Sequence, residues 1–195
     1  MPRDSRDTKT RLLDVAEMMF AEQGIWNVTN RQITEAAEQK NESALNYHFG
    51  DRSELLIAIL TRRGTELEII RGEKLQDLEE NAPTKNLVGI LVTVYASCLE
   101  EEQGRHYVRI VDQLRGWLTD WGTGASSGDN HLQHILGVLE ERSDPHRLIA
   151  MMMLMAGMTA SRAQFIADGR ELPLGHDEFV DTLTDMLTGL LQGSS

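Results

Sequence analysis

The sequence is poor in the residues that stabilise secreted domains and break helices. Its one cysteine, Cys98, cannot form an intrachain disulfide, and only four prolines occur in 195 residues. We therefore expect a reducing environment for the chain. The longest strongly apolar run without a charge, 148–160, is shorter than the roughly 18 to 20 residues of a membrane-spanning helix. Because no leader-like segment opens the sequence, we predict a cytoplasmic protein with no membrane partner.

Motifs for catalysis are also missing from the sequence. It contains no nucleophile beside a base, no H-E-x-x-H motif, no phosphate-binding glycine loop and no pair of catalytic carboxylates with supporting residues. We predict no enzymatic activity, no cofactor and no metal. An alternative hypothesis is a metal-dependent helical enzyme that uses His131 and His134, with Asp129 close by. The sequence shows no third helical ligand at the spacing that a metal site needs. Cys98 falls in an apolar stripe and is interpreted as core.

Acidic residues are distributed unevenly along the chain. The net charge is −12, yet residues 1–63 hold nine Lys or Arg against ten Asp or Glu, while residues 64–195 hold ten against twenty-one. Binding to nucleic acid depends on local basic groups rather than on the total charge. The first eleven residues are locally positive. The charge of the whole chain therefore does not exclude a DNA-binding N-terminal part.

Apolar residues recur at spacings of three and four, and no segment alternates with period two, so we predict an all-α protein. The prolines fall where helical patterns begin or stop. Gly/Ser-rich 119–130 and 168–176 are predicted connectors. Helices are expected at 8–23, from about 29, after 41, from 53 toward 80, and at 84–101, 105–118, 131–142, 145–167 and 177–191.

Two very short helices after the first one have the pattern of a helix-turn-helix. Thr29 and Gln32 form a T-x-x-Q capping box, and Asn41 is placed to cap the next helix. Leu45 and Phe49 are four residues apart and are predicted to face the core. The rest of that helix is then left on the surface as a set without carboxylates that suits the major groove: Ser43, Ala44, Asn46, Tyr47 and His48.

These residues carry a family resemblance. The strings TRLLDVAEMMFAEQG, VTNRQITEAA and SALNYHFGDRSELL, within residues 8–60, resemble the N-terminal DNA-binding domain of the tetracycline-repressor (TetR) family of bacterial transcription regulators. The resemblance implies an N-terminal three-helix helix-turn-helix domain at 1–52. It also implies a helical ligand-binding and dimerisation domain at 53–195.

The family pattern implies a role for each matching position. A hydroxyl at the start of the second helix and the arginine after it would meet a phosphate, an asparagine would read an adenine edge, and an alanine would touch a thymine methyl. Aromatic and histidine side chains would contact phosphates, and a basic residue before the fourth helix would clamp one. The implied DNA-binding residues are Thr29, Arg31, Ser43, Ala44, Asn46, Tyr47, His48 and Arg52.

The turn between the two short helices departs from the family pattern. Gln39 and Lys40 stand where the family usually has Gly and Val, so a residue other than glycine is expected at positive φ. Glu42, in the first turn of the next helix, would repel a phosphate. These departures put the aim of the recognition helix in question.

The second part of the chain is predicted to bind a second copy and a small, largely apolar effector. Apolar residues circle the last two helices more widely than one packing seam needs, which favours a homodimer through a four-helix bundle. The predicted interface residues are Met153, Phe179, Leu183, Met186 and Leu190. The predicted ligand-lining residues are Tyr95, Leu99, Tyr107, Ile110, Leu114, Trp117 and Met152.

The sequence therefore predicts a DNA-binding transcriptional regulator, a ligand-released repressor that binds a near-palindromic operator as a dimer. The alternative is an acidic helical binding protein of the same fold without DNA binding, which the departures at 39, 40 and 42 would allow. Affinity for a duplex that falls with salt separates the two hypotheses.

Overall fold

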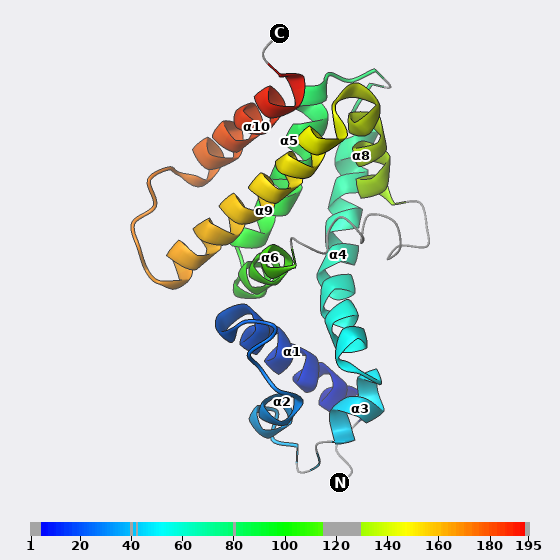
Figure 1. Ribbon diagram of the computed structural model, residues 1–195, viewed down its shortest axis with the longest axis vertical. Helices are drawn as coiled ribbons and strands as arrows, with labels where there is room; N and C mark the ends of the chain where they lie inside the picture. Colours follow the sequence, from blue (N-terminus) through cyan, green and yellow to red (C-terminus); the bar gives the residue numbers. More distant parts are fainter. Residues whose placement is uncertain (1–4, 40, 42, 80, 115–129, 194–195) are drawn as a thin grey trace.

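The computed structural model describes residues 5–39, 41, 43–79, 81–114 and 130–193, and over these residues it contains helices and no strand (Figure 1). The predicted all-α fold is confirmed. Trp117, Lys40, Glu42, Asp129 and most of the 119–130 connector lie outside the described residues. The elements are α1 (Ser5–Gln23), α2 (Asn30–Ala36), α3 (Ser43–Phe49), α4 (Arg52–Gln76), α5 (Thr84–Ala96), η1 (Ser97–Leu99), α6 (Glu102–Gln113), α8 (His131–Arg142), α9 (Pro145–Ala167) and α10 (His176–Gln192).

Two hydrophobic cores organise these helices. The N-terminal core packs α1, α2 and α3 together with the first half of α4 and the end of α6, and the C-terminal core packs α5, α8, α9 and α10. Figure 1 shows α1 to α3 as a small lower group and α4 running from it into the upper group. Leu60 of α4 belongs to the first core and Leu67 to the second. The predicted domain boundary after residue 52 stays a prediction, since α4 is shared.

Helix bounds agree with expectation where a local signal marks them. α8 and α9 begin and end at the predicted residues, and Gly24 ends α1 with a positive φ of 96°. The predicted start at Ser53 is wrong: α4 begins at Arg52, because the Asp51 side chain accepts a hydrogen bond of 2.9 Å from the Glu54 amide. α1, α6 and α10 also begin earlier than predicted. The predicted 84–101 helix ends at Ala96 and continues as the 3-10 turn η1.

The α9 helix is, within the described part of the chain, the one segment with the length and composition to cross a membrane. In this fold it packs against α6, α8 and α10. Its Met151 and Ala163 are fully buried in the C-terminal core, while Met153 and Met158 are exposed. The apolar character of α9 is therefore used inside a helical domain.

An ion-pair cluster joins α4 to α1. The Arg62 guanidinium lies 2.6 Å from an Asp14 oxygen and also donates to the carboxylate of Glu17. Burial raises the pKa of Glu17, although the charge of Arg62 opposes that rise. The cluster therefore holds the middle of α4 against α1.

Candidate nucleic-acid interface

The α3 helix is anchored from behind by Leu45 and Phe49, as the sequence predicts. Leu45 is fully buried and Phe49 nearly so, and both belong to the N-terminal core with Phe20 of α1, Ile33 of α2 and Leu55 of α4. Burying two large side chains of a seven-residue helix supplies the tertiary packing that such a short helix needs. The position of α3 is thus set by its two core residues.

The opposite side of α3 is presented to solvent. Ser43, Asn46 and Tyr47 are exposed, and the Tyr47 side chain is 81% exposed. Ala44 and His48 are half-buried, and the rings of Tyr47 and His48 meet edge to face with 5.1 Å between centroids. The helix Ser43–Phe49 contains no Asp, Glu, Lys or Arg. The surface offers an amide, a hydroxyl, a phenol and an imidazole without a carboxylate.

Side-chain caps define where the two short helices start. The Thr29 hydroxyl accepts a hydrogen bond from the Gln32 amide at 3.2 Å, and the Gln32 side chain accepts one from the Thr29 amide at 2.8 Å. The predicted capping box is therefore confirmed. The Asn41 side chain accepts a hydrogen bond of 3.0 Å from the Ser43 amide, as expected for a cap of α3.

Arg52 is placed differently from a solvated phosphate clamp. Its guanidinium donates to the carbonyl of Ile25 and, at 3.2 Å, to the side chain of Asn30, and it stacks over the Phe20 ring at 4.6 Å. Burial lowers its pKa, but an arginine stays charged at neutral pH. Arg52 thus ties the start of α4 to the beginning of the α1–α2 connection and to the first residue of α2.

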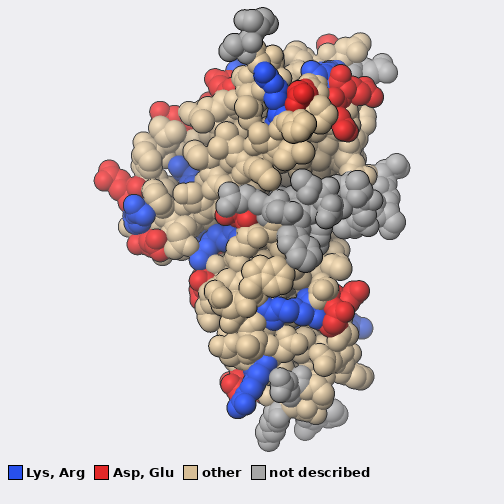
Figure 2. Space-filling model, in the orientation of Figure 1, with Lys and Arg blue, Asp and Glu red and all other residues tan. Residues whose placement is uncertain are grey.

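One arginine of α1 and one of α2 each pair with a carboxylate. Arg31 donates to Glu35 at 2.7 Å along α2, and Arg11 of α1 donates to Glu38 at 3.0 Å. Exposed ion pairs of this kind contribute little to stability, so a phosphate can compete for the arginine. Figure 2 shows Lys and Arg side chains beside carboxylates on the lower, N-terminal part of the molecule, and a group of carboxylates with some Lys and Arg at its upper end.

Among the described residues of the α2–α3 turn, Glu38 has a positive φ of 56°, which confirms that a residue other than glycine adopts this conformation. A left-handed conformation costs a residue with a Cβ about 1 to 2 kcal/mol. We expect Glu38→Gly to be more stable than Glu38→Ala by about 1 kcal/mol, because both variants lose the carboxylate and only alanine keeps the strain. Urea unfolding of the two variants measures the difference. Equal stabilities would contradict a strained turn.

Gln113, at the end of α6, joins the two parts of the molecule. Its side-chain oxygen accepts a hydrogen bond of 2.7 Å from the Ile25 amide, and its side-chain nitrogen donates one of 2.9 Å to the Phe20 carbonyl. Sequence reasoning missed this residue, since a glutamine at a helix end carries no signal about a partner some ninety positions away. The bonds fasten the end of α1 to α6.

A mostly apolar cavity of about 320 Å³ lies between α4, α5, α6, α8 and α9. Of the predicted ligand-lining residues, the structure places four on its walls: Tyr95, Tyr107, Leu114 and Met152. Leu99 and Ile110 are buried in the two cores and do not line it, and Trp117 lies outside the described residues. Sequence reasoning missed the α4 contribution, which includes Glu68 and Arg71.

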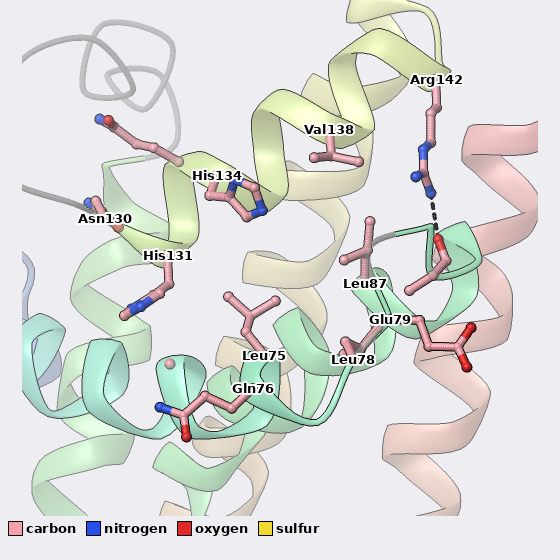
Figure 3. A pocket seen from close by; sticks show the side chains of 13 residues that line it. Leu75, Gln76, Leu78, Glu79, Leu87, Asn130, His131, His134, Val138 and Arg142 are labelled. Atoms are coloured by element: carbon pink, nitrogen blue, oxygen red, sulfur yellow. Dashed lines mark hydrogen bonds between the residues drawn. The ribbon is translucent and has the colours of Figure 1, made fainter.

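A second hollow, of about 1020 Å³, lies between the end of α4 and α8. Figure 3 shows His131 and His134 on α8 at one end of this groove and Arg142 at the other, where it donates to the Ala82 carbonyl at 2.7 Å. Across the described ranges no group of three His, Cys, Asp or Glu side chains is placed to hold a metal.

The five predicted interface residues divide between the inside and the outside of the subunit. Phe179 and Leu183 are buried in the C-terminal core, where they pack within their own chain. Met153 and Met186 are exposed and Leu190 is half-buried on the outer side of α9 and α10. Ile149 is also exposed on α9. An apolar outer face is thus present on the two helices, but only three of the five residues contribute to it.

The N-terminal helices α1, α2 and α3 form a helix-turn-helix domain that packs on α4 and α6. Residues 12–59 match the model of the family described as bacterial regulatory proteins, tetR family. The resemblance found in the sequence is confirmed over this domain, which is the part of the chain that the match covers. A comparison with curated protein sequences gave no match.

Solved structures share the fold over nearly the whole chain. NalD, the secondary repressor of the MexAB-OprM multidrug efflux pump in Pseudomonas aeruginosa, is 19% identical with a TM-score of 0.63, and the match covers 96% of this chain and 97% of NalD. The multidrug binding protein EbrR, complexed with imidazole, is 19% identical with a TM-score of 0.56 over 100% and 96% of the chains. A tetR-family regulatory protein from Rhodococcus RHA1 is 13% identical, with a TM-score of 0.53 over 96% and 98%. At these identities the likeness establishes the fold.

Proposed function

We propose that the protein is a DNA-binding transcriptional regulator whose α3 enters the major groove. The observation that carries this proposal is the exposed, carboxylate-free surface of α3 around Asn46 and Tyr47, held by two buried side chains in a domain that matches the TetR family. The fold shared with NalD, which is named a repressor, supports repression. The protein would act in the cytoplasm, on double-stranded DNA and without an enzymatic step.

The proposed contacts follow from the chemistry of each side chain. Asn46 would pair with an adenine edge and Ala44 would touch a thymine methyl, whereas Ser43, Tyr47 and His48 would contact the backbone. Thr29 and Arg31, which are exposed at the start of α2, would meet phosphates on the same side. Arg52 would add its charge near a phosphate, but its main task is to hold α2 against α4.

Selection of bound sequences from random duplexes tests the proposal. We expect enrichment of a near-palindrome, with log affinity falling against log salt by about 0.9 per neutralised phosphate. A chain that selects no sequence and ignores every duplex at low salt would instead be the acidic binding protein of the alternative hypothesis. The same experiment gives the operator and the spacing of its half-sites.

The Asn46→Ala variant is expected to lose discrimination at a single base pair of each half-site. An amide that pairs with adenine discriminates by about 1 to 3 kcal/mol, and Asn46 is exposed, so its removal leaves the core intact. Competition with duplexes altered one base pair at a time measures the change. Arg52→Ala is the comparison variant and should weaken binding to all sequences alike. A uniform loss for Asn46→Ala would assign it to the backbone.

A homodimer through the outer face of α9 and α10 is proposed to align two copies of α3. Exposed Met153 and Met186, with half-buried Leu190, give this face an apolar surface that water disfavours. A two-fold dimer would place its recognition helices about one turn of DNA apart, which requires a near-palindrome. Light scattering should give twice the chain mass at micromolar concentration, and a monomer would reject the dimer.

Release from DNA by a small ligand is the proposed form of regulation. The α6 helix contributes Tyr107 and Leu114 to the cavity wall, and its Gln113 is bonded to the end of α1. A ligand that favours one position of α6 would therefore also favour one position of the DNA-binding domain. The factor by which the bound ligand lowers the affinity for the operator is set by the ratio of the ligand's affinities for the two states.

A further inference from the structure

The walls of the 320 Å³ cavity are apolar on most sides. Leu91 comes from α5, Val111 from α6, Leu136 from α8, and Met152 and Met155 from α9. A space of this size lies at the lower end of the range for small-molecule sites. Its occupant would gain most of its affinity from buried hydrophobic surface.

Two deeply buried polar groups interrupt this apolar lining. Tyr95 is 7% exposed and Arg71 is 5% exposed, and both residues line the cavity. Within the described residues, neither the Tyr95 hydroxyl nor the Arg71 Nε–H has a hydrogen-bond partner. Buried polar groups without a partner are rare and costly, so each calls for an explanation. A ligand acceptor that binds these donors would supply one.

The charge of the lining is balanced. Glu68 and Arg71 are the two formally charged residues among the described residues that line the cavity, and Arg71 donates to Glu68. The other oxygen of Glu68 is 3.5 Å from Nδ1 of His131, and neither of these two atoms has a hydrogen-bond partner among the described residues. A charged ligand would have to lose its hydration without meeting an uncompensated counter-charge, which is unfavourable. Burial raises the pKa of Tyr95, so its hydroxyl keeps the proton that it can donate.

We propose that this cavity binds an uncharged, mostly aromatic or aliphatic molecule with one hydrogen-bond acceptor, such as a ketone, and that Tyr95 and Arg71 bind the acceptor. The inference rests on the proposed function only in naming this molecule as the ligand that releases DNA. Binding of the molecule to the cavity is a property of the DNA-free protein and is measured without DNA.

Four probes that share a core of two phenyl rings joined through one carbon test the class of ligand. Benzophenone is neutral with an acceptor, diphenylmethane is neutral without one, 4-benzoylbenzoate is an anion, and (4-benzoylbenzyl)trimethylammonium is a cation. Their affinities for the DNA-free protein are measured by calorimetry. We expect benzophenone to bind about three- to tenfold more tightly than diphenylmethane, which is the effect of one hydrogen bond, and both charged probes to bind more weakly. Tighter binding of either ion, or no preference for benzophenone over diphenylmethane, would overturn the proposal.

The Tyr95→Phe variant removes the hydroxyl and keeps the ring. It should show a weaker preference for benzophenone over diphenylmethane, because only the Arg71 donor remains, while it binds diphenylmethane unchanged. It should melt at the same or a higher temperature because the removed group has no partner among the described residues. Tyr47→Phe is the matched control, since it removes the same group from the exposed surface of α3 and should leave all four affinities unchanged. An undiminished preference in Tyr95→Phe would contradict the assignment.

Irradiation of bound benzophenone, followed by peptide mass spectrometry, locates the site. Labels on Met152 or Met155 would place it in the cavity, whereas labels on Leu75 or Val138 would place it in the α4–α8 groove and overturn the proposal. Release of a selected duplex by benzophenone is then measured separately. Binding without release would support the ligand site and count against the proposed regulation alone.

Discussion

Replacing Gly104 by alanine is expected to lower the free energy of unfolding by about 3 kcal/mol, the upper part of the usual range for overpacking. A Cβ at this position would lie 2.2 Å from the Cys98 carbonyl oxygen and 2.7 Å from a terminal nitrogen of Arg63. The first of these atoms is backbone and cannot move aside without shifting η1 from α6. Gly104 therefore permits the close approach of two successive helical segments.

Gly137→Ala is the matched control for this effect. Gly137 is also within a helix, but a Cβ there would meet nothing within 4 Å. Alanine should raise stability by about 0.5 to 1 kcal/mol, because glycine is the poorer helix former. Urea unfolding of the two variants checks the opposite signs. If both substitutions stabilised the protein, the packing of η1 on α6 would be looser than described.

Gln113→Leu is expected to lower the free energy of unfolding by about 2 to 3 kcal/mol. The substitution removes two hydrogen bonds and leaves the Ile25 amide, in a fully packed residue, without its partner. An unsatisfied buried donor costs about 1 to 3 kcal/mol by itself. Hydrogen exchange gives a specific measurement, because protection of the Ile25 amide should fall more than that of amides in α9.

Gln103→Leu on the same helix controls for the change of residue type. Gln103 is exposed, so its replacement should alter stability by less than about 0.5 kcal/mol. Gln113→Glu provides a graded test, since a carboxylate can accept from Ile25 but cannot donate to Phe20. An exchange rate at Ile25 that does not respond to Gln113→Leu would show that the amide is protected by other means.

Much of the candidate interface could be predicted because its signals are local. The four-residue spacing of Leu45 and Phe49 fixes which side of α3 is buried, and a helix of seven residues leaves little freedom beyond that. Asn41 and the Thr29–Gln32 pair mark helix starts through bonds to amides two or three positions away. The structure of such a motif is determined by residues that are only a few positions apart in the sequence.

The contacts that sequence reasoning missed depend on partners far along the chain. The guanidinium of Arg52, a predicted phosphate contact, is held by the Ile25 carbonyl of the α1–α2 connection and by the Phe20 ring of α1. Leu99 and Ile110 were expected at the cavity, yet their apolar stripes face the cores. Hydrophobic periodicity predicts that a side chain is buried, but it does not predict which residues the side chain packs against.

The sequence by itself determined the helical fold, the caps and the exposed surface of α3, since these follow from spacings of three and four residues and from bonds within one turn. Only the tertiary structure decided that Gln113 fastens α6 to α1 and that Gly104 admits a carbonyl. It also decided that Arg71 and Tyr95 share a cavity. Such contacts join helices whose relative placement is set by the packing of all of them together, which no local pattern encodes.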